Sequence, residues 1–198
     1  MYTLDEASED VLDSADALNW DKFHLVGFSM TGLIAQNILA MAGNRVKSLV
    51  AICSVAANGY EGAGEEMVEF MSSAALGDDE KALQIAAMMT NNRYCREWSE
   101  FKVRKWRETS TTDARAGYLQ MFVRNNIVSK VQGLKHPILV VSTSDDAEGL
   151  RRQAMEQTFG KWFPNVEYAE IANSGHYPMQ ETPASLATAI NKFLASKN

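Results

Sequence analysis

A serine at the junction of a predicted strand and a predicted helix is the residue of this sequence best placed to act as a nucleophile. Ser29 lies in the segment Gly-Phe-Ser-Met-Thr-Gly at 27–32, after the apolar stretch 23–26 and before a helical pattern at 33–41. A tight turn there would expose the hydroxyl of Ser29 and direct the backbone N–H of Met30 toward the same point. Such an N–H can stabilise the oxyanion of acyl transfer. A serine is also common as a plain helix N-cap, but the flanking glycine and strand favour the nucleophile.

A carboxylate and a histidine follow this serine in the chain, and each comes soon after a predicted strand. The apolar segment 137–141 precedes Asp145 and Asp146, and the segment 166–171 precedes His176. A serine hydroxyl needs a base within hydrogen-bond distance, and a histidine can serve when a carboxylate orients its imidazole. The carboxyl ends of parallel strands meet at one edge of a sheet. These residues therefore have the types and the chain positions of a Ser–His–Asp triad.

Strands and helices alternate around these residues, which predicts a parallel sheet. Thr3 and Glu6 have the spacing of a capping box at the start of the first helix. The segment 58–128 has no convincing strand and is predicted to be a helical insertion. The remaining periodicity predicts helices at 3–18, 29–42, 148–159 and 183–196 and strands at 23–26, 46–54, 138–142 and 166–171.

The order of these motifs resembles that of the α/β-hydrolase superfamily. Gly-Phe-Ser-Met at 27–30 and Ser-Gly-His-Tyr-Pro at 174–178 are most similar to the esterase, lactonase and haloperoxidase-like members. The resemblance implies an α/β-hydrolase fold with an N-terminally shortened, mostly parallel sheet, helices on both faces and a helical cap. The core would comprise 1–57 and 129–198, and the cap, or lid, would comprise 58–128.

The resemblance also implies a role for each candidate site residue. Ser29 would be the nucleophile and His176 the general base, while Met30 would supply one oxyanion N–H. Alignment of the preceding strand places Asp146, and not Asp145, at the position of the orienting acid. Asp145 is then expected to be a turn residue.

Some positions depart from the family pattern or have two readings. Thr31 and Thr143 stand where the family usually has glycine. Phe28 and Tyr177 adjoin the serine and the histidine in the sequence. They either line the acyl pocket or pack as ordinary aromatic residues.

The sequence before Gly27 contains no glycine and no proline. It therefore lacks the His-Gly loop that supplies the second oxyanion N–H in this family, and the early strands of a usual member are expected to be missing. The strand at 23–26 would then be an open edge with unpaired backbone groups. We expect the chain to form a homo-oligomer through this edge near Phe23, or to pair there with a separate N-terminal fragment.

Composition narrows the possible classes of function. The net charge is −6, and the basic segment 102–107 is predicted to be the solvated face of a helix, so nucleic-acid binding is not expected. No apolar stretch approaches the length of a membrane span, and the acidic N-terminus has no signal region. Two isolated cysteines fit a cytoplasmic protein without disulfides. Three scattered histidines do not indicate a metal site, and no cofactor is implied.

Together these observations predict a serine hydrolase that acts on small carboxylic esters or lactones through an acyl-enzyme. A cofactor-free haloperoxidase or perhydrolase and a carbon–carbon bond hydrolase would use the same triad, and the sequence does not separate them. A different class is a weakly active or non-catalytic remnant that serves in assembly or ligand binding. The missing oxyanion loop favours the remnant, whereas the intact serine, acid and histidine favour the enzyme.

Overall fold

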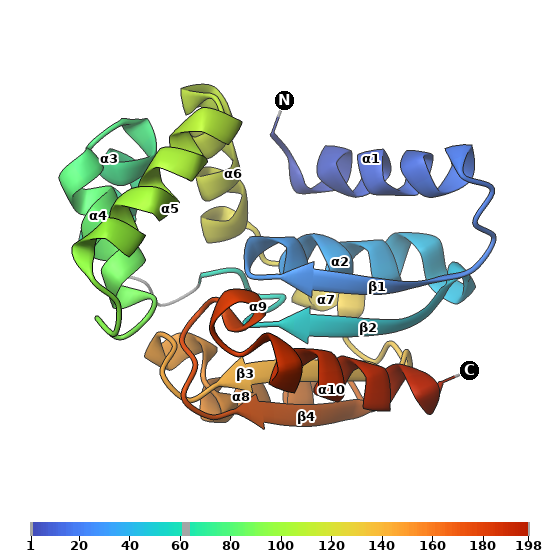
Figure 1. Cartoon of the computed structure of the whole chain (residues 1–198). Helices are drawn as coiled ribbons and strands as arrows, with labels where there is room; N and C mark the ends of the chain where they lie inside the picture. The colour runs from blue at the N-terminus through green and yellow to red at the C-terminus, as the bar shows by residue number, and fades with distance from the viewer. Residues whose placement is uncertain (1, 61–63, 198) are drawn as a thin grey trace.

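A parallel sheet forms the centre of the computed structural model, which describes residues 2–60 and 64–197. Its strands are β1 Phe23–Phe28, β2 Val46–Ile52, β3 Ile138–Thr143 and β4 Val166–Ile171. The order across the sheet is β1-β2-β3-β4, and every neighbouring pair is parallel. Figure 1 shows that all the strands point the same way, so their carboxyl ends meet at one edge. The predicted parallel sheet is confirmed.

Helices pack on both faces of this sheet. Their bounds are α1 Leu4–Ala17, α2 Met30–Ala42, α7 Val128–Val131, α8 Arg152–Trp162, α9 Pro178–Glu181 and α10 Pro183–Ala195. The face covered by α2, α7 and α8 holds the larger core, in which Leu33, Leu39 and Phe159 are fully buried. On the other face α10 contributes Leu186 and Phe193 to a second apolar cluster. α1 packs against α2 (Figure 1).

The central strand β2 is buried on both sides. Leu49 and Ala51 belong to the core under α2 and α8, whereas Val50 and Ile52 belong to the cluster under α10. This alternation follows from the two-residue period of a strand. The apolar segment 49–53 is continuous, which is typical of parallel strands covered on both faces.

The edge strand β1 departs from that expectation. Val26 is paired with the fully buried Val50, yet Val26 itself is 55% exposed. The helix on this face, α10, packs against β3 and β4, on the far side of the sheet from β1. Helices cover both faces of the sheet as predicted, but on this face the cover does not extend to Val26. Among the described residues β1 is an open edge of the sheet, as expected.

The capping box predicted from Thr3 and Glu6 is present at the start of the first helix. The hydroxyl of Thr3 accepts a hydrogen bond from the backbone N–H of Glu6 (3.2 Å), and the carboxylate of Glu6 accepts the N–H of Thr3 (3.3 Å). This is the predicted capping box of α1.

Among the described residues no helix is long and apolar enough to cross a bilayer, and α1 and α5 (Arg96–Thr109) have 14 residues each.

A group of helices between β2 and β3 lies beyond the carboxyl ends of the strands (Figure 1). It consists of α3 Glu65–Leu76, α4 Asp79–Met88, α5 and α6 Thr112–Arg124, and we call these helices the cap. The cap has a small apolar cluster of its own, formed by Ala74, Ala82 and Val103. Within its described residues the segment contains helices and no named strand, as predicted. Residues 61–63 lie outside the described part of the chain, and the domain limits at 58 and 128 stay a prediction.

Candidate active site

Ser29 lies in the turn between β1 and α2 with an unusual backbone conformation. Its φ of 53° and ψ of −123° fall where residues other than glycine are rarely found. The N–H of Ser29 donates to the carbonyl of Ile52 (2.9 Å), and its own carbonyl accepts the N–H groups of Gly32 and Val55 (3.0 Å each). These bonds hold the strained turn, and they fix the serine at the carboxyl edge of the sheet.

Two glycines allow strand and helix to approach each other at this turn. A Cβ on Gly27 would lie 2.7 Å from the Cα of Gly32, and a Cβ on Gly32 would lie 1.9 Å from the hydroxyl oxygen of Ser54. No side chain fits at either position without moving backbone or a buried neighbour. The glycine at 27 was part of the predicted motif, whereas the need for glycine at 32 becomes clear only from its contact with Ser54.

Thr31 occupies the position where the family pattern has glycine, and its hydroxyl has a specific task. The hydroxyl accepts a hydrogen bond from the backbone N–H of Phe28 (2.8 Å) and donates one to the carbonyl of Phe28 (2.8 Å). Phe28 ends β1, which has β2 on one side and, among the described residues, no strand on the other. The threonine therefore supplies partners that a glycine could not, and sequence reasoning missed this role.

The structure brings Ser29, His176 and Asp146 together into one chain of contacts. The hydroxyl oxygen of Ser29 is 2.9 Å from Nε2 of His176. Nδ1 of the same imidazole is 2.9 Å from Oδ2 and 3.1 Å from Oδ1 of Asp146. These are hydrogen-bond distances, and the side chains of His176 and Asp146 are only 6% and 0% exposed. The three residues that the sequence selected are adjacent in space.

The carboxylate decides which nitrogen of His176 carries the proton. An ionised carboxylate only accepts hydrogen bonds, so Nδ1 must be the donor to Asp146. In the neutral imidazole Nε2 is then the acceptor, and the hydroxyl of Ser29 donates to it. This is the tautomer in which a histidine can take the proton of a serine that attacks a carbonyl group.

The two neighbouring aspartates have different partners. Oδ1 of Asp146 also accepts the backbone N–H of Ala147 (2.7 Å), which leaves the carboxylate bound on two sides. Asp145 instead forms an ion pair with Arg93, which lies between α4 and α5. Asp146, and not Asp145, is therefore the carboxylate that lies against His176.

Met30 is the first residue of α2, directly after the strained serine. The first N–H groups of a helix have no partner within the helix, and the helix dipole adds partial positive charge there. The N–H of Met30 is thus suited to an oxyanion, as the sequence predicted, although this role itself stays a prediction.

Two aromatic side chains surround the imidazole of His176. The ring centroids of Phe28 and Tyr177 lie 5.0 Å and 5.4 Å from that of His176. Burial, and then the charges of Asp146 and Glu181, raise the pKa of Tyr177 to about 12. Tyr177 also lines a cavity of about 380 Å³ with residues of α4 and α5. That Phe28 and Tyr177 line an acyl pocket stays a prediction.

The basic segment 102–107 is not simply a solvated helix face. Nζ of Lys102 lies 3.8 Å from the centre of the Tyr177 ring and 3.2 Å from the side-chain oxygen of Gln180. Burial lowers the pKa of Lys102. The prediction fails at this residue because α5 packs over the loop that follows His176, while Arg104 and Lys105 are exposed as expected.

Cys53 lies beside the candidate acid and base. One ligand atom from each of Cys53, Asp146 and His176 falls within 4.8 Å of the others. Burial, and then the charge of Asp146, raise the pKa of the Cys53 thiol, while the hydroxyl of Thr143 lies 3.8 Å from its sulfur. A thiol must lose its proton to bind a metal ion. The arrangement therefore favours a neutral thiol packed beneath a His–Asp pair over a metal centre.

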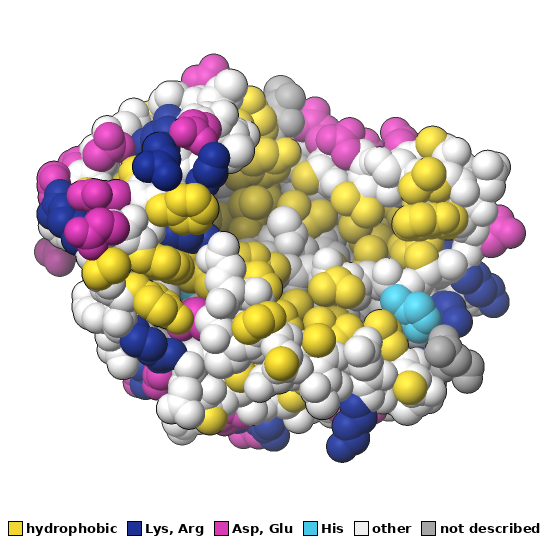
Figure 2. Space-filling model, in the orientation of Figure 1, with side chains coloured by type: hydrophobic (Ala, Val, Ile, Leu, Met, Phe, Trp, Pro, Cys, Tyr) yellow, Lys and Arg dark blue, Asp and Glu magenta, His cyan; other side chains and the backbone are white. Residues whose placement is uncertain are grey.

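An apolar cavity of about 650 Å³ extends from Met30 into the cap. Figure 2 shows apolar side chains gathered in a hollow between the cap helices and the first two helices of the chain. Met30 directly follows Ser29 in the chain, so one end of this cavity lies beside the candidate nucleophile. Its lining includes Met30, Met71, Met89, Trp106, Tyr118 and Phe122.

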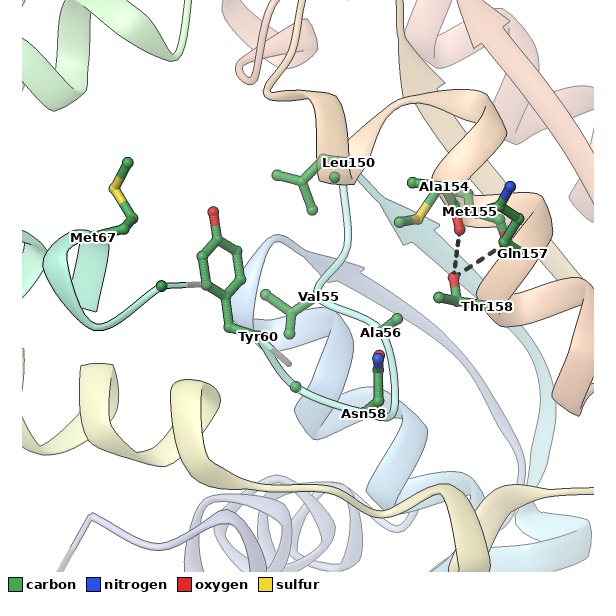
Figure 3. A pocket seen from close by; sticks show the side chains of 13 residues that line it. Val55, Ala56, Asn58, Tyr60, Met67, Leu150, Ala154, Met155, Gln157 and Thr158 are labelled. Atoms are coloured by element: carbon green, nitrogen blue, oxygen red, sulfur yellow. Dashed lines mark hydrogen bonds between the residues drawn. The ribbon is translucent and has the colours of Figure 1, made fainter. Parts of the chain in front are cut away.

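A second cavity, of about 490 Å³, lies between the segment after β2 and α8 (Figure 3). Val55, Tyr60, Met67 and Leu150 line one side of it, and Thr158 lies on α8, bonded to carbonyl groups of its own helix. None of Ser29, Asp146 and His176 is among the lining residues of either cavity, but the apolar cavity includes Met30, the neighbour of Ser29, and this one does not. We therefore do not assign the reaction to this cavity.

A parallel sheet, a strained serine between a strand and its following helix, and a helical cap inserted between β2 and β3 are together features of the α/β-hydrolase fold. A family model described as alpha/beta hydrolase fold matches residues 1–183, and the chain belongs to this family. The family and the fold expected from the sequence are confirmed.

Individual relatives are distant. The chain is 22% identical over 190 residues to the esterase YbfF of Escherichia coli (strain K12), a match that covers 94% of this chain and 73% of that protein. A bromoperoxidase from Bacillus anthracis matches with a TM-score of 0.84 at 16% identity, over 98% of this chain and 75% of that one. An enol-lactonase from Burkholderia xenovorans LB400 matches with a TM-score of 0.80 at 19% identity, over 98% of this chain and 73% of that one. At such identities the two structures show a shared fold and not a shared substrate.

Proposed function

We propose that this protein is a serine hydrolase that cleaves small carboxylic esters or lactones through an acyl-enzyme. The observation that carries the proposal is the continuous path from the Ser29 hydroxyl to Nε2 of His176 (2.9 Å) and from Nδ1 to Asp146 (2.9 Å). A helix N-cap serine would not need a buried histidine and a buried acid in line with it.

Acylation follows from this geometry. The Ser29 oxygen attacks the carbonyl carbon of the ester while Nε2 of His176 takes the hydroxyl proton. Negative charge develops on the carbonyl oxygen, where the N–H of Met30 can donate to it. The tetrahedral intermediate collapses, the ester C–O bond breaks, and His176 returns the proton to the departing alkoxide. Asp146 stabilises the imidazolium during these steps.

Deacylation uses the same residues with water as the nucleophile. Nε2 of His176 takes a proton from a water molecule as its oxygen attacks the acyl-enzyme carbonyl. Collapse of the second tetrahedral intermediate breaks the bond to Ser29, and His176 returns the proton to the serine oxygen. The products are a carboxylic acid and the regenerated enzyme, and for a lactone the acid and the alcohol remain in one molecule.

The cavity beside Met30 supports an apolar acyl group as part of the substrate. Its methionine and aromatic lining offers contact area and few fixed polar partners. Methionine side chains adapt to different shapes, so the cavity suits a range of acyl groups better than one rigid ligand.

Hydrolysis of p-nitrophenyl butyrate tests the proposal. We expect the wild-type chain to release p-nitrophenolate and Ser29→Ala to lose about 10⁴-fold or more of that rate, with a comparable loss for Asp146→Asn. Ser185→Ala, an exposed serine on α10, is the matched control and should retain the wild-type rate. An unchanged rate in Ser29→Ala would contradict the proposal. A folded but inactive wild type would favour the non-catalytic remnant.

A further inference from the structure

We propose that Glu181 is a positioning residue for the catalytic histidine. Its carboxylate accepts hydrogen bonds from the backbone N–H groups of the residues before and after His176. This inference rests on the proposed function, because it assigns Glu181 a role through His176. Glu181 ends the short helix α9, five residues after the histidine, and it has no place in the triad.

The two carboxylate oxygens of Glu181 bind two different amides of the histidine loop. Oε2 accepts the backbone N–H of Gly175 (2.9 Å), and Oε1 accepts the backbone N–H of Tyr177 (3.0 Å). The amide between them, that of His176 itself, donates to the carbonyl of Met89 (2.7 Å). Three consecutive N–H groups are thus held, two by one side chain and one by the end of α4.

Burial and a neighbouring opposite charge strengthen these two hydrogen bonds. The side chain of Glu181 is only 1% exposed, and a buried carboxylate is costly unless it is hydrogen-bonded and paired. The guanidinium of Arg93 lies 3.3 Å from Oε2 and supplies the opposite charge. Arg93 also binds the carbonyl of Asn173 and the carboxylate of Asp145. One cation therefore joins the Glu181 carboxylate to the loops that carry both the histidine and the acid.

Capping of a short helix does not account for these contacts. Tyr177 is the N-cap of α9, so a bond from its N–H to Glu181 alone would resemble one half of a capping box. Gly175 lies outside that helix, and its amide is bound by the other oxygen of the same carboxylate. The two hydrogen bonds fix the backbone on either side of His176. The backbone conformation there determines the direction in which the imidazole side chain points.

Position matters here because the proton path is short. Nε2 of His176 must stay near 2.9 Å from the Ser29 hydroxyl while Nδ1 stays on Asp146. A displacement of about 1 Å in such a group can cost about 100-fold in rate. Glutamine keeps the shape of Glu181 but has one acceptor oxygen, so one of the two amides would face an NH₂ group.

Kinetic comparison of two glutamine variants is the first part of the test. We expect Glu181→Gln to lower kcat for p-nitrophenyl butyrate by about 10- to 100-fold with less than a twofold change in KM. Glu170→Gln, the same substitution at an exposed position of β4, is the matched control and should leave both constants unchanged. Equal kcat in Glu181→Gln and wild type would overturn the inference and leave the proposed function standing.

Proton NMR of the imidazole gives a readout that does not require activity. The chain has three histidines, so the downfield signal of a proton held between Nδ1 of His176 and Asp146 can be assigned by its loss in Asp146→Asn. We expect the signal in wild type and Glu170→Gln and its loss or broadening in Glu181→Gln. An unchanged signal in Glu181→Gln, or none in wild type, would overturn the inference whatever the rates are.

The two proposals can fail separately. If wild type is inactive but the signal is present and depends on Glu181, the proposed function fails and the positioning role stands. If Glu181→Gln does not fold, Glu181→Asp replaces it, because its shorter acid cannot reach both amides. The same loss of kcat and signal is then expected, and unchanged values would overturn the inference.

Discussion

The backbone N–H of His176 donates a hydrogen bond to the carbonyl oxygen of Met89 (2.7 Å), the C-cap residue that follows α4. The candidate base is therefore joined to the cap by main chain as well as by packing. A cap fixed at this point cannot move away as a whole without disturbing the histidine loop. Any opening for substrate must take place in other parts of the cap.

Substitution of Gly175 tests the close contact between the histidine loop and the segment that follows α4. A Cβ at this position would lie 2.5 Å from the carbonyl oxygen of Met89 and 2.7 Å from the Cα of Thr90. We expect Gly175→Ala to lower the free energy of unfolding by about 1–3 kcal/mol and to slow ester hydrolysis, because backbone must shift. Gly149→Ala is the control, since beyond its chain neighbours no atom of the described residues lies within 4 Å of its added Cβ. Urea unfolding that is the same for both variants would contradict this contact.

Thr31 tests the support of the serine turn. Valine has the shape of threonine without the hydroxyl, so Thr31→Val should remove both bonds to Phe28 and lower the free energy of unfolding by about 1 kcal/mol. Thr31→Ser should retain most of that stability. Chemical denaturation measures the difference, and equal stability of the valine and serine variants would show that the hydroxyl contributes nothing.

Tyr177 should make the protein less stable at high pH. Its pKa is raised from 10.0 to about 12 in the folded state, chiefly by burial. Between these values the unfolded chain loses the phenol proton while the folded chain keeps it, so the stabilising contribution is complete below pH 10 and is lost as the pH approaches 12. The loss should be about 3 kcal/mol. Denaturation at several pH values should show a shallower decline in Tyr177→Phe, and parallel curves would contradict the assignment.

The open edge at β1 leads us to expect association between copies of this chain. Val26 is 55% exposed on a strand that has one neighbour among the described residues, and such edges pair readily with other strands. Light scattering should show a mass above that of the monomer that rises with concentration. Val26→Lys should reduce it, whereas Val11→Lys, at an exposed position of α1, should not. A single monomeric mass at every concentration would rule this association out.

Much of the fold and the identity of the candidate triad could be predicted because they depend on short-range patterns. The predicted strands ended within two residues of the observed strand ends, and Ser29, Asp146 and His176 each followed a predicted strand. In a parallel sheet the carboxyl ends of the strands lie at one edge, so the positions of the three residues in the chain were enough to predict that they lie close together.

The supporting contacts could not be predicted because they arise from tertiary approach. Glu181 bears a weak signal, an acid shortly after a proline that begins a helix, but its second amide partner lies outside that helix. The link from Arg93 to Asp145 joins the cap to the sheet across a long stretch of sequence. Likewise, the exposure of Val26 depends on where α10 lies and not on the sequence of β1.

Labelling with a fluorophosphonate tests the central claim most directly, because the probe reacts only with an activated serine. The account predicts one phosphonylated residue in the folded wild-type chain, identified by mass spectrometry as Ser29, and no labelling of Ser29→Ala. His176→Gln should also be unlabelled, since the serine then has no base. A folded wild type that stays unlabelled, or a label on another serine, would contradict the proposed nucleophile.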